Sequence, residues 1–298
     1  MSPIPPQISC RAYAKINLGL RVTGKRTDGY HEICTVFHRI GLFDEILLRP
    51  ADSITVQTTD PVVPSGEMNI CHAAALMLRE SLNGGTGVRA GVHPGVSIAI
   101  TKSIPAGAGL GGGSADAAAV LRSLPALWGT GIAEEDLRGL ALRLGSDVPF
   151  FLGEDSALGT GRGEVLEYFR LDVPFAILLC TPPVQVSTRW AYSRIVPRPP
   201  ERADQEDLRS VLLRGMSDPL LLREHLVNDF ESPVFREHPV IRSIKESMAR
   251  DGALFASMSG SGSSVYGFFH DTGAAGHAAA SLTSPGFRTF ITPPHSRV

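Results

Sequence analysis

The sequence predicts an α+β fold built from two domains. The chain has 298 residues, which suggests about two domains of 100 to 200 residues each. In the first half, two helices are expected to follow each other with no strand between them. The second half shows the order β-α-β-β-α-β of a ferredoxin-like split βαβ domain. We expect the boundary near residue 155, with an N-terminal domain over residues 1–155 and a C-terminal domain over residues 156–298.

The first domain is predicted to open with a half-buried strand. Over residues 11–22, apolar side chains alternate with polar ones, so Lys15 and Asn17 are expected to project from the same face, the one directed away from the core. Strand and helix signals then predict four more strands and one helix. The strands are expected over residues 35–40, 45–49, 54–58 and 96–101, and the helix over residues 69–82.

Two helices follow, and then the elements of the second domain begin. Residues 114–127 are rich in alanine and predict a helix. Residues 133–144 predict a second helix, because three acidic side chains stand in its first turn and Gly145 follows its last turn. A polar, proline-rich excursion through residues 198–200 interrupts the second domain. Its strands are expected over residues 175–181, 254–258, 265–269 and 288–292, and its helices over residues 239–250 and 274–282.

Composition places the chain among ordinary globular proteins. There are 28 basic and 30 acidic side chains, a formal charge of -2, which argues against a nucleic-acid partner. The sequence contains no run of about 18 apolar residues, the length that a membrane span needs. Its N-terminus lacks the pattern of a secretory signal. The cysteines and the nine histidines lack the spacing of metal ligands. We expect a cytoplasmic protein with reduced thiols and without a structural metal or a membrane partner.

Glycine is the one departure from an average composition, with 31 residues, many of them in a few tight clusters. The densest cluster, residues 105–116, reads Pro-Ala-Gly-Ala-Gly-Leu-Gly-Gly-Gly-Ser-Ala-Asp and runs into a predicted helix. Glycines at a helix N-terminus let the backbone approach an anion, which the N–H groups and the helix dipole attract. We interpret the cluster as a phosphate-binding loop. The alternative, a flexible linker, is disfavoured by its position between a strand and a helix.

The loop fits none of the commonest nucleotide-binding patterns. Gly107, Gly109 and Gly112 satisfy G-x-G-x-x-G, but a dinucleotide-binding fold would return to a parallel strand after the helix, and here a second helix is expected. The sequence contains no G-x-x-x-x-G-K-[ST], which excludes a P-loop, and neither H-R-D nor D-F-G, which excludes a protein kinase. A different class of nucleotide-binding protein is required.

Asp147 and Lys15 are candidates for chemistry, each with a plainer alternative. Asp147 lies between two apolar stretches, where it either caps a short helix or turn near Pro149 or is a carboxylate held in a site. Lys15, taken alone, is most often an ordinary solvated side chain on a strand face.

Four stretches together resemble the GHMP kinase superfamily. They are Ala-Lys-Ile-Asn-Leu at residues 14–18, the glycine loop, Leu-Gly-Ser-Asp-Val-Pro-Phe-Phe at residues 144–151, and Ser-Gly-Ser-Gly-Ser-Ser at residues 259–264. Within the superfamily, residues 24–32 and 160–164 are similar to the branch whose substrate is 4-diphosphocytidyl-2-C-methyl-D-erythritol. The resemblance covers almost the whole chain in family order, and residues 24–32 are its most specific part.

The resemblance implies both a fold and an activity. The fold is the two-domain GHMP kinase fold, with an N-terminal ribosomal-protein-S5-like ATP-binding domain and a C-terminal ferredoxin-like domain. The activity is ATP-dependent phosphorylation of the methylerythritol 2-hydroxyl of this cytidine-diphosphate-linked substrate, in the non-mevalonate route to isoprenoid precursors. ATP is the co-substrate, and Mg²⁺ is expected to accompany it and bridge its β- and γ-phosphates.

The resemblance also implies roles for individual residues. Asp147 is the catalytic carboxylate, expected either to accept the proton of the attacking hydroxyl or mainly to orient that hydroxyl, and Lys15 is its catalytic partner. Where two serines often stand in the family, this sequence has Ser114-Ala115, which removes a hydroxyl contact at Ala115 but leaves the backbone cradle. The ATP-binding residues are Pro105, Ala106, Gly107, Ala108, Gly109, Leu110, Gly111, Gly112, Gly113, Ser114 and Ala115.

For the substrate, the resemblance implies Asn17, Tyr30, His31, Thr188 and Tyr192. An aromatic ring can stack on cytosine and a histidine can hydrogen-bond its polar edge, which suits Tyr30 and His31. Their alternative is a hairpin tip whose ring only packs against the protein. From the opposite side, Tyr192 and the nearby Trp190 compete for the stacking role. Residues 259–264 are either a second glycine loop near the substrate or a plain hairpin turn.

Two other functions stay open on the sequence alone. The first is that of another GHMP kinase, one that phosphorylates a small molecule such as homoserine or mevalonate. The second is that of a nucleotide-binding regulator that has kept the fold and lost catalysis. The sequence predicts no oligomeric state.

Overall fold

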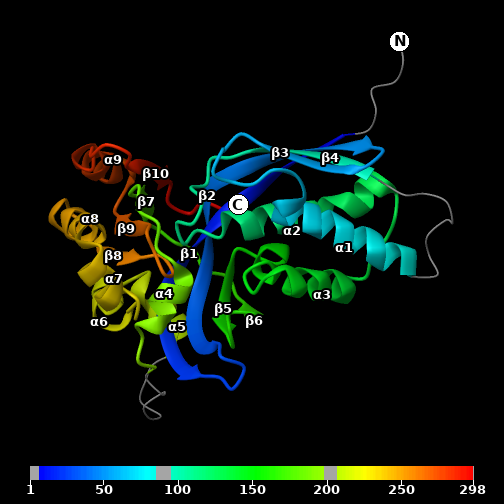
Figure 1. Cartoon of the computed structure of the whole chain (residues 1–298). Coiled ribbons are helices and arrows are strands. Elements are labelled where there is room, and N and C mark those ends of the chain that lie inside the picture. The colour runs from blue at the N-terminus through cyan, green and yellow to red at the C-terminus, as the bar shows by residue number, and fades with distance from the viewer. Residues whose placement is uncertain (1–6, 85–94, 198–206, 298) are drawn as a thin grey trace. The chain divides into compact units, whose positions relative to one another are not determined.

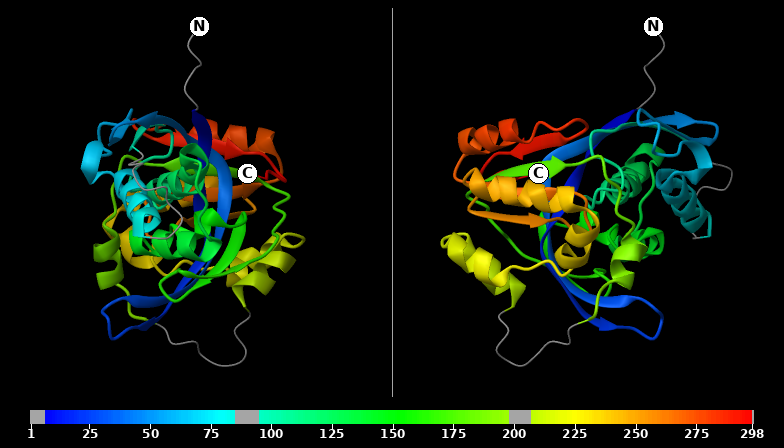
Figure 2. Two further views of the ribbon diagram at one scale, coloured as in Figure 1. Left: turned by 90° about the vertical axis from the view of Figure 1, so that its right-hand side faces the viewer. Right: turned by 60° about the vertical axis from the view of Figure 1, so that its left-hand side comes forward.

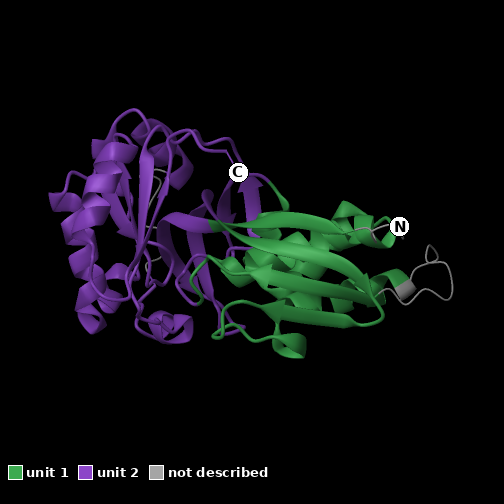
Figure 3. Cartoon of the chain, turned by 90° about the horizontal axis from the view of Figure 1, so that it is seen from above, with its two compact units in different colours: residues 1–14, 43–106, 111–153 green, residues 15–42, 107–110, 154–298 purple. Residues whose placement is uncertain are grey.

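The structure, a computed structural model, describes residues 7–84, 95–197 and 207–297. The chain forms two compact units, coloured in Figure 3: unit 1 takes in residues 1–14, 43–106 and 111–153, and unit 2 takes in residues 15–42, 107–110 and 154–298. Two long strands, β1 (Ile8–Lys25) and β2 (His31–Ala51), pair with each other and contribute residues to both units. Each unit therefore combines distant segments, and the expected domains over residues 1–155 and 156–298 stay a prediction.

The described residues of unit 1 form a small sheet with three α-helices beside it. Strand β4 (Gly95–Thr101) pairs with the C-terminal half of β2 on one side, antiparallel, and with β3 (Ile54–Thr58) on the other, parallel. Helices α1 (Ile70–Gly84), α2 (Gly112–Trp128) and α3 (Glu134–Leu144) contact one another and lie on the same side of β3 and β4 in Figure 1. Short 3-10 helices precede α1 (η1, Gly66–Met68) and follow α3 (η2, Pro149–Leu152).

The core of unit 1 lies between its sheet and its helices, as amphipathic elements require. Side chains from both layers are fully buried there: Ile46, Leu48, Val56, Ile98, Leu78, Leu121 and Leu124. Helices α2 and α3 follow each other with no strand between them among the described residues, as the sequence predicts.

Unit 2 is built on a four-stranded antiparallel sheet. Its strands are β7 (Ala176–Thr181), β8 (Phe255–Met258), β9 (Val265–Phe269) and β10 (Arg288–Thr292), in the order β10-β7-β9-β8. Helices α8 (Pro239–Arg250) and α9 (Thr272–Ser281) pack on one face of this sheet, which the right-hand view of Figure 2 shows. With the inserted helices set aside, the order β7-α8-β8-β9-α9-β10 confirms the predicted ferredoxin-like domain.

Among its described residues, the insertion between β7 and α8 contains four short helices, where the sequence indicates only a polar excursion. They are α4 (Thr188–Ser193), α5 (Leu208–Gly215), α6 (Pro219–His225) and α7 (Glu231–Glu237). None exceeds eight residues, so hydrophobic periodicity cannot reveal them. The predicted proline-rich residues 198–200 lie outside the described residues.

Strand β2 differs from the prediction, because the two expected strands over residues 35–40 and 45–49 form one continuous strand. Asp44 interrupts the apolar pattern, yet its buried carboxylate accepts hydrogen bonds from the backbone N–H groups of Ser103 and Ile104. In unit 2, the other half of β2 pairs with β5 (Ser156–Thr160), which forms a hairpin with β6 (Val165–Tyr168). The sequence prediction contains neither β5 nor β6. Across the described residues, no helix is both long and apolar enough to cross a membrane.

Candidate active site

In unit 2, Lys15 and Asn17 of β1 form a hydrogen-bonded pair. The Nζ atom of Lys15 donates to Oδ1 of Asn17 at 2.7 Å, which confirms that the two side chains share one face of the strand. The expectation that this face lies outside the core is wrong, because Lys15 is only 4% exposed and Asn17 only 2%. Asn17 donates through Nδ2 to the Thr35 hydroxyl at 2.9 Å, and Lys15 donates to the carbonyl oxygen of Gly109 at 3.2 Å.

The glycine loop approaches this pair through its crest, residues 107–110, which belongs to unit 2. Gly107, Gly109 and Gly111 have φ angles of 68°, 79° and 70°, in the left-handed region where a glycine is favoured. At Gly109 an added Cβ would lie 2.9 Å from the carbonyl oxygen of Gly262, so this position also needs a glycine for a close approach. The crest is thus shaped by its glycines and is not a flexible linker.

Residues 259–264 hold the crest from the other side. The Ser259 hydroxyl donates to the Gly109 carbonyl oxygen at 3.1 Å, and the Ser264 N–H donates to the Ala108 carbonyl oxygen at 3.2 Å. Ser259 also accepts a hydrogen bond from the Asn17 N–H at 3.2 Å. These residues connect β8 and β9, as a hairpin turn does, but their contacts make them a second loop beside Lys15 and Asn17.

The rest of the glycine loop forms the first turn of α2 in unit 1. The helix begins at Gly112, two residues before the predicted start, and no side chain caps it at Gly111. A helix N-terminus without a side-chain cap presents N–H groups suited to an anion. Ala115 is 2% exposed, so its methyl group belongs to the core and not to a ligand surface. Pro105 and Ala106, half-buried, lead into the loop from the end of β4.

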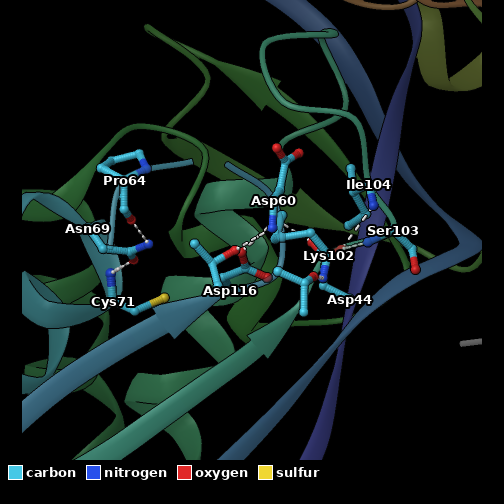
Figure 4. Close-up of polar contacts among 11 residues, drawn as sticks. Asp44, Asp60, Pro64, Asn69, Cys71, Lys102, Ser103, Ile104 and Asp116 are labelled. Carbon is cyan, nitrogen blue, oxygen red and sulfur yellow. Dashed lines mark hydrogen bonds and ion pairs between the residues drawn. The ribbon is translucent and has the colours of Figure 1, made fainter. Parts of the chain in front are cut away.

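Beside this helix start lies a buried ion cluster that the sequence prediction does not contain (Figure 4). The Nζ atom of Lys102 bonds the Asp44 carboxylate and, at 2.7 Å, Oδ2 of Asp116, and all three side chains are at most 4% exposed. Asp44 in turn accepts from the N–H groups of Ser103 and Ile104 at 2.5 and 2.9 Å. The cluster ties the end of β4 to the first turns of α2. Charged residues within apolar runs were the available signal in the sequence.

The cluster has more negative than positive groups, and this affects Asp116. Burial raises the pKa of Asp116 to about 7; the Lys102 ammonium opposes this rise and the Asp44 carboxylate adds to it. Asp116 therefore holds a proton more readily than an exposed aspartate does.

Asp147 lies in unit 1 in the turn between α3 and η2, and its side chain is half-buried. The residue at the N-cap position of η2 is Val148, so Asp147 stands one residue before the cap position of this helix. Val148 and Phe150, both buried, anchor the chain directly after Asp147 and so hold its backbone in place.

At the tip of the β1–β2 hairpin, unit 2 presents aromatic side chains. Tyr30 is 56% exposed, and the Arg162 guanidinium lies 4.8 Å from the centre of its ring. His31 stacks on Tyr192, with ring centres 4.9 Å apart and planes at 23°. Partial burial, followed by the charge of Lys25, lowers the pKa of His31, which favours the neutral imidazole. A neutral imidazole can both donate and accept a hydrogen bond.

Helix α4 carries the remaining substrate candidates. Tyr192 contacts His31, whereas Trp190 contacts His238, with ring centres 6.0 Å apart. We therefore count Tyr192, and not Trp190, with Tyr30 and His31 in the aromatic cluster of unit 2. Thr188 at the start of the helix shares a hydrogen bond of 3.1 Å with the hydroxyl of Ser261 in the second loop. Unit 2 therefore brings Lys15 and Asn17 together with the loop crest. It also brings Tyr30 together with Arg162 of the β5–β6 hairpin, and His31 together with Tyr192 of α4. Among the residues that the structure describes, no group of three or more His, Cys, Asp or Glu side chains could hold a metal ion.

Comparison with known proteins gives two family matches and many similar chains. Residues 69–154 match the family described as GHMP kinases N terminal domain, and residues 209–287 match GHMP kinases C terminal. A 4-diphosphocytidyl-2-C-methyl-D-erythritol kinase of Chlorobium phaeobacteroides (strain BS1) is 43% identical over 279 residues, 91% of this chain and 92% of the relative.

Solved structures agree with these matches. A crystal structure of 4-(cytidine 5'-diphospho)-2C-methyl-D-erythritol kinase superposes with a TM-score of 0.78 at 33% identity, covering 97% of this chain and 100% of that chain. A homoserine kinase from Cytophaga hutchinsonii superposes with a TM-score of 0.72 at 20% identity, covering 100% and 98% of the two chains, which shows a common fold alone.

Proposed function

The chain belongs to the GHMP kinase family, and on this premise we propose that it transfers the γ-phosphoryl group of ATP to the 2-hydroxyl of the methylerythritol portion of 4-diphosphocytidyl-2-C-methyl-D-erythritol. The observation that carries the proposal is the 43% identity, over nearly the full length, to a kinase named for this substrate. The reaction belongs to the non-mevalonate route to isoprenoid precursors. The four cysteines are unpaired thiols, which suits a reducing compartment such as the cytoplasm.

The glycine loop is assigned to the ATP phosphates. Three glycines with positive φ shape the loop, and the start of α2 supplies N–H groups and the positive end of the helix dipole. In phosphoryl transfer Mg²⁺ is held largely by the nucleotide phosphates together with one or two carboxylates. The lack of a preformed three-ligand cluster among the described residues is compatible with this arrangement. We therefore treat Mg²⁺ as part of the MgATP substrate, which neutralises phosphate charge, and assign it no protein ligand.

Lys15 is assigned to the charge that develops during transfer. The side chain is buried, and Asn17 and the Gly109 carbonyl oxygen hold its Nζ atom in one place. Because Gly109 belongs to the loop assigned to the triphosphate, the amine is positioned to stabilise negative charge on the transferred group. Such preorganised charge lowers the barrier without reorganisation during the reaction.

Asp147 is assigned to the attacking hydroxyl. Its carboxylate orients the hydroxyl and takes its proton as the substrate oxygen bonds to the γ-phosphorus and the bond to the ADP oxygen breaks. The turn that holds Asp147 is anchored by buried apolar neighbours, which suits a group that must be positioned closely.

The cytidine end is assigned to the aromatic cluster of unit 2. The exposed Tyr30 ring offers a surface on which a base can stack, and the neutral His31 imidazole can hydrogen-bond the polar edge of cytosine. Tyr192 supports His31 by stacking, and Thr188 joins α4 to the second glycine loop. These contacts support Tyr192 over Trp190 as the aromatic residue of α4 that serves the substrate.

A coupled assay of ADP release tests the proposal. Purified protein is incubated with MgATP and, in parallel, with 4-diphosphocytidyl-2-C-methyl-D-erythritol, homoserine, mevalonate or no acceptor. The proposal predicts rapid ADP release with the diphosphocytidyl acceptor alone. Faster release with homoserine or mevalonate would assign the protein to another GHMP kinase, and ATP binding without release would indicate a nucleotide-binding regulator.

A further inference from the structure

The segment between α6 and α7 in unit 2 lies along strand β1. The Leu20 N–H donates to the Val227 carbonyl oxygen at 2.8 Å, and the Asp229 N–H donates to the Leu20 carbonyl oxygen at 2.9 Å. The Asp229 carboxylate also accepts from the Val22 N–H at 2.7 Å. These bonds fix the backbone of residues 227–229 to the strand that carries Lys15.

Asn228, in the middle of this segment, directs its side chain at the second glycine loop. Its Nδ2 atom donates to the carbonyl oxygens of Met258 at 2.7 Å and Gly260 at 2.8 Å, while its Oδ1 atom accepts from the Phe230 N–H at 3.0 Å. The residue is only 6% exposed. Both amide hydrogens of this buried side chain are therefore used to hold the residues on either side of Ser259.

Glu231, the first residue of α7, fixes the neighbouring part of the same stretch. Its Oε1 atom accepts from the Ser257 hydroxyl and the Met258 N–H, both at 2.9 Å, and its Oε2 atom accepts from Lys245 at 2.6 Å. Hydrogen bonds to a carboxylate are stronger than those between neutral groups. Asn228 and Glu231 together therefore restrain the whole stretch from Ser257 to Gly260.

This stretch contacts the residues assigned to phosphoryl transfer. Ser259 bonds both the Gly109 carbonyl oxygen at 3.1 Å and the Asn17 N–H at 3.2 Å. Gly260 lies against the Lys15–Asn17 pair, because a Cβ added to it would be 3.1 Å from Oδ1 of Asn17 and 3.8 Å from Nζ of Lys15. A displacement of this stretch would therefore be transmitted to the loop crest and to Lys15.

We propose that Asn228 is a positioning residue for phosphoryl transfer, which holds the second glycine loop in place and through it the Gly109 crest and the Lys15–Asn17 pair. This inference rests on the function proposed above. Asn228 touches neither substrate nor the reacting atoms in this account. Its contribution is to fix the distance between β1 and the second glycine loop. That distance determines how the Lys15 amine is placed relative to the crest of the phosphate-binding loop.

Asn228→Asp is the sharpest test, because it keeps the Oδ1 acceptor for Phe230 and replaces the Nδ2 donor with an oxygen that faces two carbonyl oxygens. Misplacement of a catalytic group by about 1 Å can cost about 100-fold in rate, so we expect kcat to fall by about 10- to 100-fold. The KM for the cytidine substrate should change by less than about threefold, since substrate binding at Tyr30 and His31 is unaltered. Asn228→Ser, which removes both donations without adding charge, should lower kcat in the same direction.

Arg223 provides a matched control. It also donates two hydrogen bonds to backbone carbonyl oxygens near β8, those of Leu254 at 2.6 Å and Ala253 at 2.9 Å, but at the end of the strand away from the loop. Arg223→Gln should lower the thermal midpoint while kcat stays at the wild-type value. A kcat within about threefold of wild type in both Asn228 variants, or an equal loss in Arg223→Gln, would overturn the proposal.

Hydrogen exchange followed by mass spectrometry gives a readout that does not depend on the reaction. Loss of the Asn228 bonds should increase exchange in peptides that contain residues 259–264 and 107–110, and Arg223→Gln should leave these peptides at the wild-type rate. Unchanged exchange in the Asn228 variants contradicts the positioning role even if the wild type proves to phosphorylate nothing. Wild-type protein that is inactive on the diphosphocytidyl acceptor, with exchange altered as expected, overturns the proposed function alone.

Discussion

Substitution of Gly109 by alanine tests whether the loop crest depends on its backbone shape. The residue has a φ angle of 79°, where an L side chain costs about 1–2 kcal/mol relative to glycine. The new Cβ would also lie 2.9 Å from the Gly262 carbonyl oxygen, a distance that forces the second loop to move. Gly109→Ala should therefore lower the free energy of unfolding by at least about 1–2 kcal/mol.

Gly113→Ala is the matched control within the same loop. Gly113 lies in the first turn of α2, and the nearest atom to an added Cβ, Cγ2 of Ile70, is 3.8 Å away. Because alanine favours a helix over glycine, this variant should gain about 0.5–1 kcal/mol. Urea unfolding should thus separate the two variants by about 1.5–3 kcal/mol. Equal stabilities for the two variants, or a Gly109→Ala variant as stable as the wild type, would refute this account of the crest.

Three further predictions concern the chemistry, the substrate and pH. Asp147→Asn should abolish most ADP release while the ATP affinity, measured by calorimetry, stays near wild type; an unchanged kcat would remove Asp147 from the mechanism. Tyr192→Ala should weaken CDP binding in thermal-shift titrations much more than Trp190→Ala, and the reverse order would reassign the role. Because burial raises the pKa of Asp116 from an ordinary 3.8 to about 7, the folded protein holds a proton that the unfolded chain releases, so stability falls as the pH rises between these values. Asp116→Asn should therefore gain in thermal midpoint over the wild type from about pH 5 to about pH 8, and a constant difference would contradict this.

Local sequence signals were sufficient to predict the bounds of an element whose first and last residues are marked by the sequence itself. Helix α8 begins at Pro239, where proline suits the first helical position, and Gly252 follows its end, so its bounds agree with the prediction. Strand β9 likewise has the predicted bounds, Val265–Phe269. The glycine loop could be recognised because its residues are consecutive in the sequence.

The burial of Lys15 could not be predicted, because strict alternation identifies a shared face but not what covers that face. The partners of Asn17 come from elsewhere in the chain: Thr35 is 18 residues away and Ser259 is 242 residues away. The same limit applies to Asn228, whose side chain contacts residues about thirty positions further on. Contacts between distant segments depend on tertiary packing, which no local pattern contains.

The ion cluster of unit 1 was missed for a related reason. Asp44 and Lys102 each stand beside an apolar run, but Lys102 bonds carboxylates 58 and 14 residues away. Neither spacing corresponds to the turn of a helix or the pleat of a strand, so the partnership becomes visible only in the folded chain.

The most direct test of the central claim is to follow the γ-phosphoryl group itself. Protein is incubated with ATP labelled at the γ-phosphate and a mixture of 4-diphosphocytidyl-2-C-methyl-D-erythritol and homoserine, and the products are separated and examined by phosphorus NMR. The account predicts that the label is found on the 2-hydroxyl of the methylerythritol portion. Label on homoserine, on a different hydroxyl, or only in inorganic phosphate would contradict it.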